Sequence, residues 1–370
     1  MLAGAGGSAS QVHKQLRNIV FAAAVVVTLF ILLQSFHIGT HEIQHTTSQS
    51  LQVINSFTPT AWRRPTSKVT KVTALFGEEN EIYEAAIRSH EEHNRLHNYP
   101  IRILRERIIN NFWSKPAYLL SLVIEELAKP PSTRSAWLVW FGPDIILLNP
   151  HIPLELFLPP PDFPNLHFIG THDPTGLNTG IFFLSVSEWS VNLLIDVLAL
   201  PKTSSSSSSP SLASATDKDQ AALQQTLTLP AYRAAVVYQP RAWFNTYQLS
   251  ATHFEGHPGN LLVHFHDLDG DRWSSMSHYL AQISQPNSTW RVPLSLTTYE
   301  SEVEEFWDRL RSAGTLLDES QRQFGVEGVE EKARRLGYAF HFEADVEGTM
   351  LRAMDDLKVA MGIREGEKVV

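Results

Sequence analysis

Asp144 is an acidic residue whose surroundings in the sequence would suit the binding of a cation. In "WLVWFGPDIILLNP" (137–150), Asp144 lies between two apolar runs, directly after Gly142 and Pro143. A carboxylate in such a place can hold a divalent cation, and the ordinary alternative is a carboxylate that caps a turn. The question raised by the stretch is therefore whether Asp144 is a site residue, a turn residue or part of a larger motif.

A second stretch, "NLLVHFHDLDGDRW" (260–273), joins histidines to acids. His264 and His266 are two residues apart, so they would share one face of a strand. Imidazole nitrogen is a common metal ligand, although a histidine packed in the core is the ordinary alternative. Asp267 and Asp269 follow closely, but the rest of an EF-hand loop and its closing glutamate are missing. We interpret this stretch as a strand and a loop.

Two further positions have residue types suited to phosphate or nucleotide. Lys115 stands at the opening of a predicted helix, where it could meet phosphate with help from the helix dipole, or be a solvated surface charge. Gly77 follows Phe76 at the end of a predicted strand, where glycine allows close approach of the backbone or serves an ordinary turn.

The elements that would position these residues alternate between strands and helices. The pattern predicts strands over 68–77, 99–106 and 136–141, and between them helices over 79–98 and 113–130. This order is typical of an α/β fold with a parallel sheet. Ligands bind at the carboxyl ends of the strands in such sheets, and Asp144 lies at the carboxyl end of the third strand.

The later part of the chain continues the alternation and then changes. We expect a strand over 166–173, a glycine and asparagine loop at 176–180, then a strand and a helix. A low-complexity serine-rich insertion covers 201–216, and a helix with an acidic first turn begins after it. From Tyr299 onward the spacing of apolar residues is helical.

The composition excludes several classes of function. The 370 residues contain no cysteine, so zinc–thiolate sites, disulfides and thiol catalysis are excluded. The net charge is −9, so nucleic acid is not expected as a partner.

Residues 19–36 are uncharged and predict a single membrane span, with Lys14 and Arg17 on its cytosolic side. A cleaved signal peptide is the competing interpretation. We expect a cytosolic tail over 1–18 and a stem over 37–67.

The order of these motifs is similar to that of fungal glycosyltransferase family 34, the type II galactosyl- and mannosyltransferases of the Golgi membrane. The resemblance covers about Val69 to Leu310 and follows "VTALFG", "HNYPIRIL", "WSKPAYLL", "WLVWFGPDIILLNP", "GLNTGIFFL", "DQAAL" and "LLVHF". It implies a GT-A fold over 68–312, followed by a helical C-terminal extension over 313–370. It also implies a lumenal domain, a UDP- or GDP-hexose donor, a glycan acceptor, and retention of anomeric configuration.

The resemblance further implies a divalent metal, usually Mn²⁺, held by a D-x-D motif. Family members read "WFDAD" where this chain reads "WFGPD", so only the last acid, Asp144, is present. His264 matches the family histidine that is the further metal ligand. The missing first acid could weaken donor binding without abolishing the metal site, or it could mark an impaired enzyme.

The resemblance also implies roles near the sugar and the nucleotide. The matched donor- and acceptor-binding positions are Phe76, Gly77, Lys115, Asp173, Asn178 and Gly180. Asp219 and Gln220 match the acid and amide near the anomeric carbon, although a charge at a helix N-terminus also explains Asp219. Either a side chain attacks the sugar as a nucleophile, or the acceptor attacks on the face from which the diphosphate leaves, with Gln220 stabilising the cationic sugar. The second route is preferred, because an amide oxygen is a poor nucleophile.

Trp243, Phe244 and Asn245 match an aromatic element of the family, which core packing explains equally well. Two functions follow from the sequence. The first is a retaining hexosyltransferase of the Golgi membrane. The second is a catalytically impaired homologue that serves as a binding or scaffold subunit of a transferase complex, and the Gly142-Pro143 pair is the feature behind it.

Overall fold

The computed structural model of the protein describes residues 69–109, 111–204, 218–323 and 325–363. The predicted tail, membrane span and stem, and most of the serine-rich insertion, lie outside these residues and stay predictions. Within the described ranges, no helix combines the length and the apolar character needed to cross a membrane.

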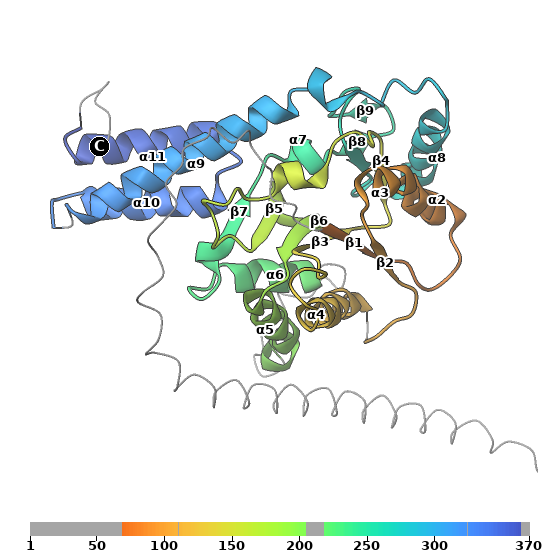
Figure 1. Cartoon of the computed structure of the whole chain (residues 1–370), viewed down its shortest axis with the longest axis horizontal. Coiled ribbons are helices and arrows are strands. Elements are labelled where there is room, and N and C mark those ends of the chain that lie inside the picture. The colour runs from red at the N-terminus through yellow and green to blue at the C-terminus, as the bar shows by residue number, and fades with distance from the viewer. Residues whose placement is uncertain (1–68, 110, 205–217, 324, 364–370) are drawn as a thin grey trace, which may run out of the picture. The chain divides into compact units, whose positions relative to one another are not determined.

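A six-stranded sheet in the order β2-β1-β3-β6-β5-β7 forms the centre of the molecule (Figure 1). Strand β1 is parallel to β2 and β3, and β5 is parallel to β7, whereas β6 runs antiparallel to both of its neighbours. The mixed, mainly parallel α/β class predicted from the sequence is confirmed. The strands of this sheet are β1 (Val69–Ala74), β2 (Ile101–Leu104), β3 (Trp137–Phe141), β5 (Phe168–Asp173), β6 (Gly176–Ser185) and β7 (Val236–Tyr238).

Two short strand pairs lie outside the central sheet. Strand β4 pairs with β10 in antiparallel register, and β8 pairs with β9. Their bounds are β4 (Ile145–Leu147), β8 (Gln248–Ser250), β9 (His253–Phe254) and β10 (Leu262–His264). Because β4 follows β3 after a three-residue turn, the β4–β10 pair brings a distant segment to the carboxyl end of β3.

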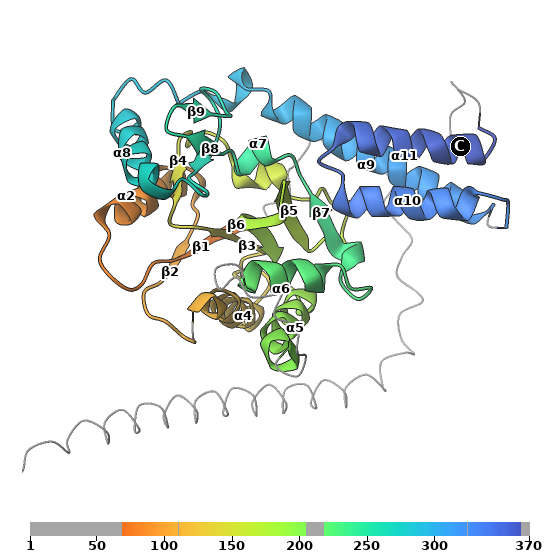
Figure 2. The same cartoon turned by 180° about the vertical axis from the view of Figure 1, so that it is seen from behind.

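Helices cover both faces of the sheet, as Figures 1 and 2 show. The helices are α2 (Glu81–Ser89), α3 (Glu91–His97), α4 (Ser114–Leu127), α5 (Glu188–Ser204), α6 (Lys218–Leu227), α7 (Arg241–Phe244), α8 (Arg272–Ile283), α9 (Tyr299–Gln321), α10 (Val329–Phe342) and α11 (Glu347–Ala360). Short 3-10 turns are η1 (Asn111–Trp113), η2 (Leu154–Phe157), η4 (Arg233–Ala235), η5 (Asp269–Asp271) and η6 (Leu294–Leu296).

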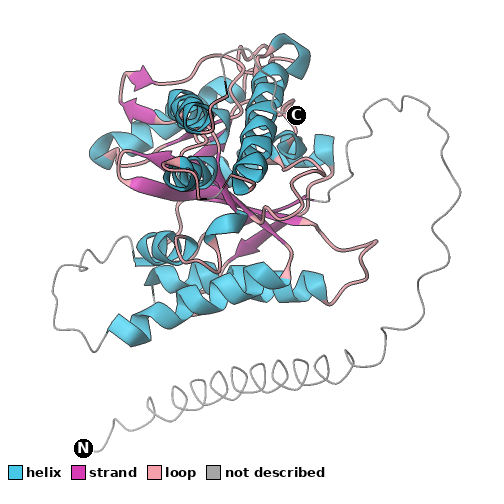
Figure 3. Ribbon diagram, turned by 90° about the vertical axis from the view of Figure 1, so that its left-hand side faces the viewer, coloured by secondary structure: helices cyan, strands magenta, loops and turns pink. Residues whose placement is uncertain are grey.

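The alternation of side chains along β3 divides the core into two layers. Leu138 and Trp140 face the layer of α4, α5 and α6. Val139 and Phe141 face the opposite layer, which includes α2, α7 and α9. The edge-on view in Figure 3 shows helices on either side of the strands. A strand buried on both faces explains why 137–141 reads as a continuous apolar run.

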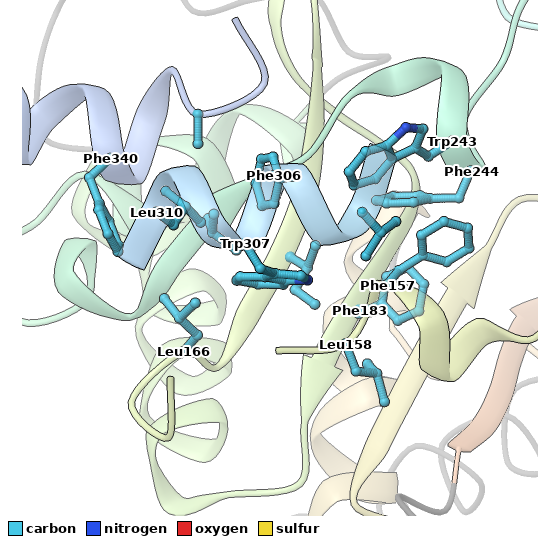
Figure 4. Close-up of a cluster of buried hydrophobic side chains, with 14 of the residues drawn as sticks. Phe157, Leu158, Leu166, Phe183, Trp243, Phe244, Phe306, Trp307, Leu310 and Phe340 are labelled. Carbon is cyan, nitrogen blue, oxygen red and sulfur yellow. The ribbon is translucent and has the colours of Figure 1, made fainter. Parts of the chain in front are cut away.

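Helix α9 connects the sheet core to the C-terminal helices. Its residues Phe306, Trp307 and Leu310 pack with Phe183 of the sheet and with Trp243 in one buried cluster (Figure 4). The helix runs without interruption through residue 312. The boundary that we predicted there therefore does not coincide with the end of a helix. Helices α10 and α11 contribute to the same cluster, and all the described residues belong to one compact unit.

Two local predictions were wrong. The helix predicted over 79–98 is two helices, α2 and α3, separated at His90. The backbone amide of His90 donates to Ile87, three residues back, and its buried ring faces Lys71, with 3.2 Å between Lys71 Nζ and His90 Nδ1. The loop predicted at 176–180 is the first half of β6, because Gly176, Leu177 and Asn178 pair with the end of β5.

Candidate active site

The structure brings Asp144 and His264 together at the carboxyl end of β3. Asp144 is the last residue of the turn between β3 and β4, and His264 is the last residue of β10, in register with Ile145. Asp144 Oδ2 lies 3.7 Å from His264 Nε2, and the two side chains are 22% and 3% exposed. The site therefore opens to solvent on the Asp144 side, while the imidazole is enclosed.

Two glycines form the floor beneath this pair. The amide of Gly142 donates to the carbonyl of Gly180 at 2.7 Å, so the turn after β3 is fastened to β6. A Cβ at Gly180 would lie 2.2 Å from Cε1 of His264, and one at Gly142 would lie 2.5 Å from Oδ1 of Asp144. Both ligand-type side chains therefore occupy space that a side chain on the floor would take. In this structure Gly142 accommodates the folded-back carboxylate of Asp144.

A chain of amides sets the orientation of His264. The backbone amide of Gly180 donates to Oδ1 of Asn178 at 3.0 Å, which identifies this atom as an acceptor. Asn245 therefore presents its Nδ2 to Asn178 at 3.0 Å, and the same nitrogen donates to Thr171 at 2.7 Å. Its Oδ1 then faces His264 Nδ1 at 2.8 Å. It follows that Nδ1 of His264 is the donor, and Nε2 is directed at Asp144.

The electrostatics of this pair suit a cation. A neutral imidazole with its proton on Nδ1 turns a lone pair toward the carboxylate, and a cation between the two would be attracted by both groups. Burial raises the pKa of the Asp144 carboxyl, but the neighbouring His264 and the charge of Arg272 together hold that pKa below its ordinary value. Asp144 is therefore ionised at neutral pH.

Asp144 and His264 are close enough to bind the same divalent ion. Their separation of 3.7 Å is less than two metal–ligand bonds of roughly 2.1 Å each, so both atoms could bind one ion. Asn245 holds the second nitrogen of the imidazole, as is usual for metal-bound histidines. Within the described ranges no three side chains of the His, Cys, Asp and Glu types gather as a metal site.

Asp173 and Asn178 belong to the same group. Asp173 Oδ1 accepts from the amide and hydroxyl of Thr175 at 2.7 and 2.6 Å, and Oδ2 accepts from Asn178 at 3.2 Å and Tyr247 at 3.1 Å. Burial raises the pKa of Asp173, but these hydrogen bonds bring it below its ordinary value. Its oxygens are thus engaged in holding the β5–β6 hairpin and the amide chain in place.

Lys115, Asp219 and Gln220 form a second group on the other face of β6. Lys115 Nζ lies 2.8 Å from Asp219 Oδ2 and 3.0 Å from the hydroxyl of Thr179. Gln220 Oε1 accepts from the amide and hydroxyl of Thr179 at 2.9 and 3.0 Å. Thr179 stands between Asn178 and Gly180, which face the first group. The predicted residues thus lie at one end of β6 but on two faces of it.

The other predicted residues lie at the margin. Phe76 follows the end of β1 with Arg107 over its ring at 5.6 Å, and Gly77 is exposed with φ of 107°. In the described chain we find no contact that joins either to the Asp144–His264 pair. His266 lies with its ring 5.6 Å from that of His264 and pairs with Asp267 at 3.0 Å.

The role of Asn245 is not predicted by the sequence. The two aromatic residues before it, Trp243 and Phe244, pack in the core. Asn245 instead orients His264. No local signal marks it, because its partners are 19, 67 and 74 residues away in the chain.

Comparison with known proteins bears on the segment that contains most of these groups. Residues 161–269 match the model of the galactosyl transferase GMA12/MNN10 family, glycosyltransferase family 34. The resemblance predicted from the sequence is confirmed for this segment. It includes Asp173, Asn178, Gly180, Gln220 and His264, whereas Asp144 and the "WFGPD" stretch precede it.

No curated protein matches the chain. Among solved structures, it is similar to a glycosyltransferase involved in the glycosylation of the major capsid of PBCV-1, with 17% identity over 57% of this chain and 98% of that chain, and a TM-score of 0.42. It is also similar to the galactosyltransferase LgtC in complex with donor and acceptor sugar analogs. There the identity is 8%, the coverage is 60% of this chain and 98% of that chain, and the TM-score is 0.35.

Proposed function

We propose that the protein is a retaining glycosyltransferase of GT-A type that moves a hexose, galactose or mannose, from a UDP- or GDP-sugar to a glycan acceptor. The observation that carries this proposal is the Asp144–His264 pair, with His264 oriented by Asn245 and its strand inside the segment that matches the family. A nucleoside diphosphate leaves with negative charge, and a site that calls for a cation is suited to it.

Asp144 and His264 would hold a divalent ion, Mn²⁺ in this proposal, which would neutralise the charge of the leaving diphosphate. The chain's own residues do the positioning. Asn178 and Asn245 keep His264 in one orientation, and the floor of Gly142 and Gly180 makes room for the two ligands.

The geometry of Gln220 favours one of the two routes to retention. Its amide oxygen accepts two hydrogen bonds from Thr179, so that oxygen is occupied and is not directed as a nucleophile. In our proposal the acceptor hydroxyl forms the new bond to the anomeric carbon on the face from which the diphosphate leaves. The hydroxyl proton passes to a diphosphate oxygen. Gln220 and Lys115 act from the other face of β6, where their hydrogen bonds to Thr179 hold the strand that carries Asn178 and Gly180.

A donor screen tests the proposal. The purified full-length chain is incubated with UDP- and GDP-hexoses, with and without Mn²⁺, and both hydrolysis and transfer to glycans are measured. We expect Mn²⁺-dependent turnover with at least one donor, reduced at least a hundredfold by Asp144→Asn or His264→Ala, whereas Asp318→Asn, on α9, leaves it unchanged. Absence of any metal-dependent affinity for UDP- or GDP-sugars would contradict it.

The second candidate, a binding or scaffold subunit, rests on the Gly142-Pro143 pair and on the finding that, among the residues the structure describes, no third His, Cys, Asp or Glu joins Asp144 and His264. It predicts that a partner transferase keeps its activity when Asp144 and His264 are both replaced. Loss of transfer by the isolated chain in each single variant would exclude it.

The proposed location is the Golgi membrane, with residues 19–36 as a single span and the domain in the lumen. Asn287, in the only Asn-x-Ser/Thr sequence of the chain, is exposed after α8 and could carry a glycan there. In eukaryotic cells we expect an endoglycosidase-sensitive mobility shift that Asn287→Gln removes. A full-length chain with no such shift would argue against lumenal orientation.

A further inference from the structure

Arg272 begins a helix that packs against β4, its charge acts on Asp144, and the proposed mechanism gives it no role. It is the first residue of α8, which follows β10 after a short loop. Its half-buried guanidinium donates from Nη1 to the hydroxyl of Tyr83 at 3.2 Å, and its Nε is buried without a hydrogen-bond partner in the described chain. Buried N–H groups are nearly always paired, so an unpaired one on a cation calls for a ligand.

The acids around Arg272 leave it available. The charges of Asp144 and Asp267 act on the guanidinium. Asp144 is nevertheless paired with His264 and Asp267 with His266, and no described carboxylate forms an ion pair with Arg272. The charge of Arg272 therefore acts on the Asp144–His264 pair, while no described carboxylate binds the guanidinium directly.

Tyr83 holds Arg272 from one side. Tyr83 belongs to α2, which packs against α8, and its ring meets the edge of Trp273 at 5.0 Å and 61°. Tyr83 and Arg272 are 189 residues apart in the chain, so this contact is made only by the fold. Because Nη1 is anchored on the tyrosine, the remaining N–H groups of the guanidinium keep a defined direction.

We propose that Arg272, positioned by Tyr83, binds a phosphate oxygen of the donor's diphosphate beside the Asp144–His264 pair, and that this contact is made with or without a metal ion. A guanidinium presents planar N–H groups that match phosphate oxygens. The inference rests on the proposed function, since it takes the donor to be a nucleoside diphosphate sugar. The Arg272 guanidinium would thus add a positive charge to a site where Asp144 is the only carboxylate among the two proposed metal ligands.

The test compares binding of UDP and GDP to the full-length protein by calorimetry, in EDTA and in Mn²⁺, with inorganic pyrophosphate as a competitor. The variants are Arg272→Gln, Arg272→Lys and Tyr83→Phe. The control is Arg322→Gln, which removes an equal charge from an exposed ion pair with Glu319. Thermal unfolding of each variant is measured alongside, and Tyr83→Phe keeps the test valid if Arg272→Gln does not fold.

We expect Arg272→Gln to weaken nucleoside diphosphate binding about tenfold to a hundredfold in both conditions, as for loss of a charge-assisted hydrogen bond. Arg272→Lys should recover part of the loss, Tyr83→Phe should weaken binding severalfold, and pyrophosphate should compete less well against the Arg272→Gln variant. Equal affinity of Arg272→Gln and wild type, with wild type binding UDP or GDP, would overturn this inference alone. Failure of wild type to bind either nucleotide, with or without Mn²⁺, would overturn the proposed function as well.

Discussion

Gly180→Ala tests whether the glycine floor holds His264 in place. The added Cβ would lie 2.2 Å from Cε1 and 2.8 Å from Nε2 of His264. Ordinary carbon contacts are about 3.5 Å, so the imidazole must move by roughly 1.3 Å. The ring is 3% exposed and hydrogen-bonded to Asn245, so it cannot move without losing that bond. The backbone of Gly180 is not in the left-handed region, so alanine adds no strain of its own.

The expected effects follow from this displacement. Overpacking of a filled interior costs about 1–3 kcal/mol of the free energy of unfolding. Movement of a ligand and loss of its orienting partner lowers metal affinity about tenfold to a hundredfold. A misplacement of about 1 Å at the reacting centre lowers turnover on the order of a hundredfold.

Three measurements check these values: urea unfolding, Mn²⁺ affinity from the electron paramagnetic resonance signal of the free ion, and transfer of hexose. Gly337→Ala on α10 is the matched control, since a Cβ there meets open space and should not destabilise the fold. The decisive variant is the double one, Gly180→Ala with His264→Ala. Removing the imidazole removes the two closest contacts and leaves Asn178 Oδ1 at 3.0 Å, so most of the destabilisation by Gly180→Ala should disappear in that background.

The proposed role of the glycine floor would be refuted by a Gly180→Ala protein that binds Mn²⁺ and transfers hexose like wild type. It would also be refuted if the cost in unfolding free energy were the same with and without the His264 ring, because the clash would then not be the cause.

The remaining predictions concern Asn245, the Lys115–Asp219 ion pair and the buried His90. Asn245→Ala, measured by urea unfolding and Mn²⁺ binding, should lose about 1–3 kcal/mol of stability and about tenfold to a hundredfold in metal affinity, and unchanged metal affinity would contradict the role of Asn245. Lys115→Met should lower the free energy of unfolding by about 3 kcal/mol, because it leaves the buried Asp219 carboxylate unpaired. Adding Asp219→Leu should restore much of that stability in urea unfolding, and no restoration would mean that loss of the ion pair is not the cause. Burial lowers the pKa of His90 well below its ordinary value, so below pH 6.5 the unfolded chain binds a proton that the folded chain does not. The free energy of unfolding should therefore fall as the pH drops from 6.5 to 5, by up to about 1.4 kcal/mol per pH unit from this group. In urea unfolding at several pH values, His90→Gln should reduce this dependence of stability on pH, whereas the exposed His278→Gln should leave it unchanged.

Much of the local architecture could be read from short-range patterns. The apolar run at 137–141, the helix predicted over 113–130 and the helical spacing from Tyr299 onward all correspond to elements of the fold. Asp144 was placed correctly at the carboxyl end of the third strand, because a strand buried on both faces and the turn after it leave a clear mark on neighbouring residues.

Other features depended on contacts that the sequence could not reveal. The direction of β6 and the break at His90 are set by partners elsewhere in the fold, as are the two faces on which the predicted residues lie. Their residue types suit loops, helices or strands equally well in isolation.

The types of the chemical groups were present in the sequence from the start: one acid after Gly-Pro, a histidine at a strand end, an acid and amide opening a helix. Their arrangement was not. His264 meets Asp144 because β10 pairs with β4, and Asn245 turns the imidazole because its own amide is held by Asn178. Register and hydrogen-bond direction between segments far apart in the chain are properties of the packed molecule. For that reason Gly142, which reads in the sequence as a missing acid, is in the fold the residue that leaves room for the acid that is present.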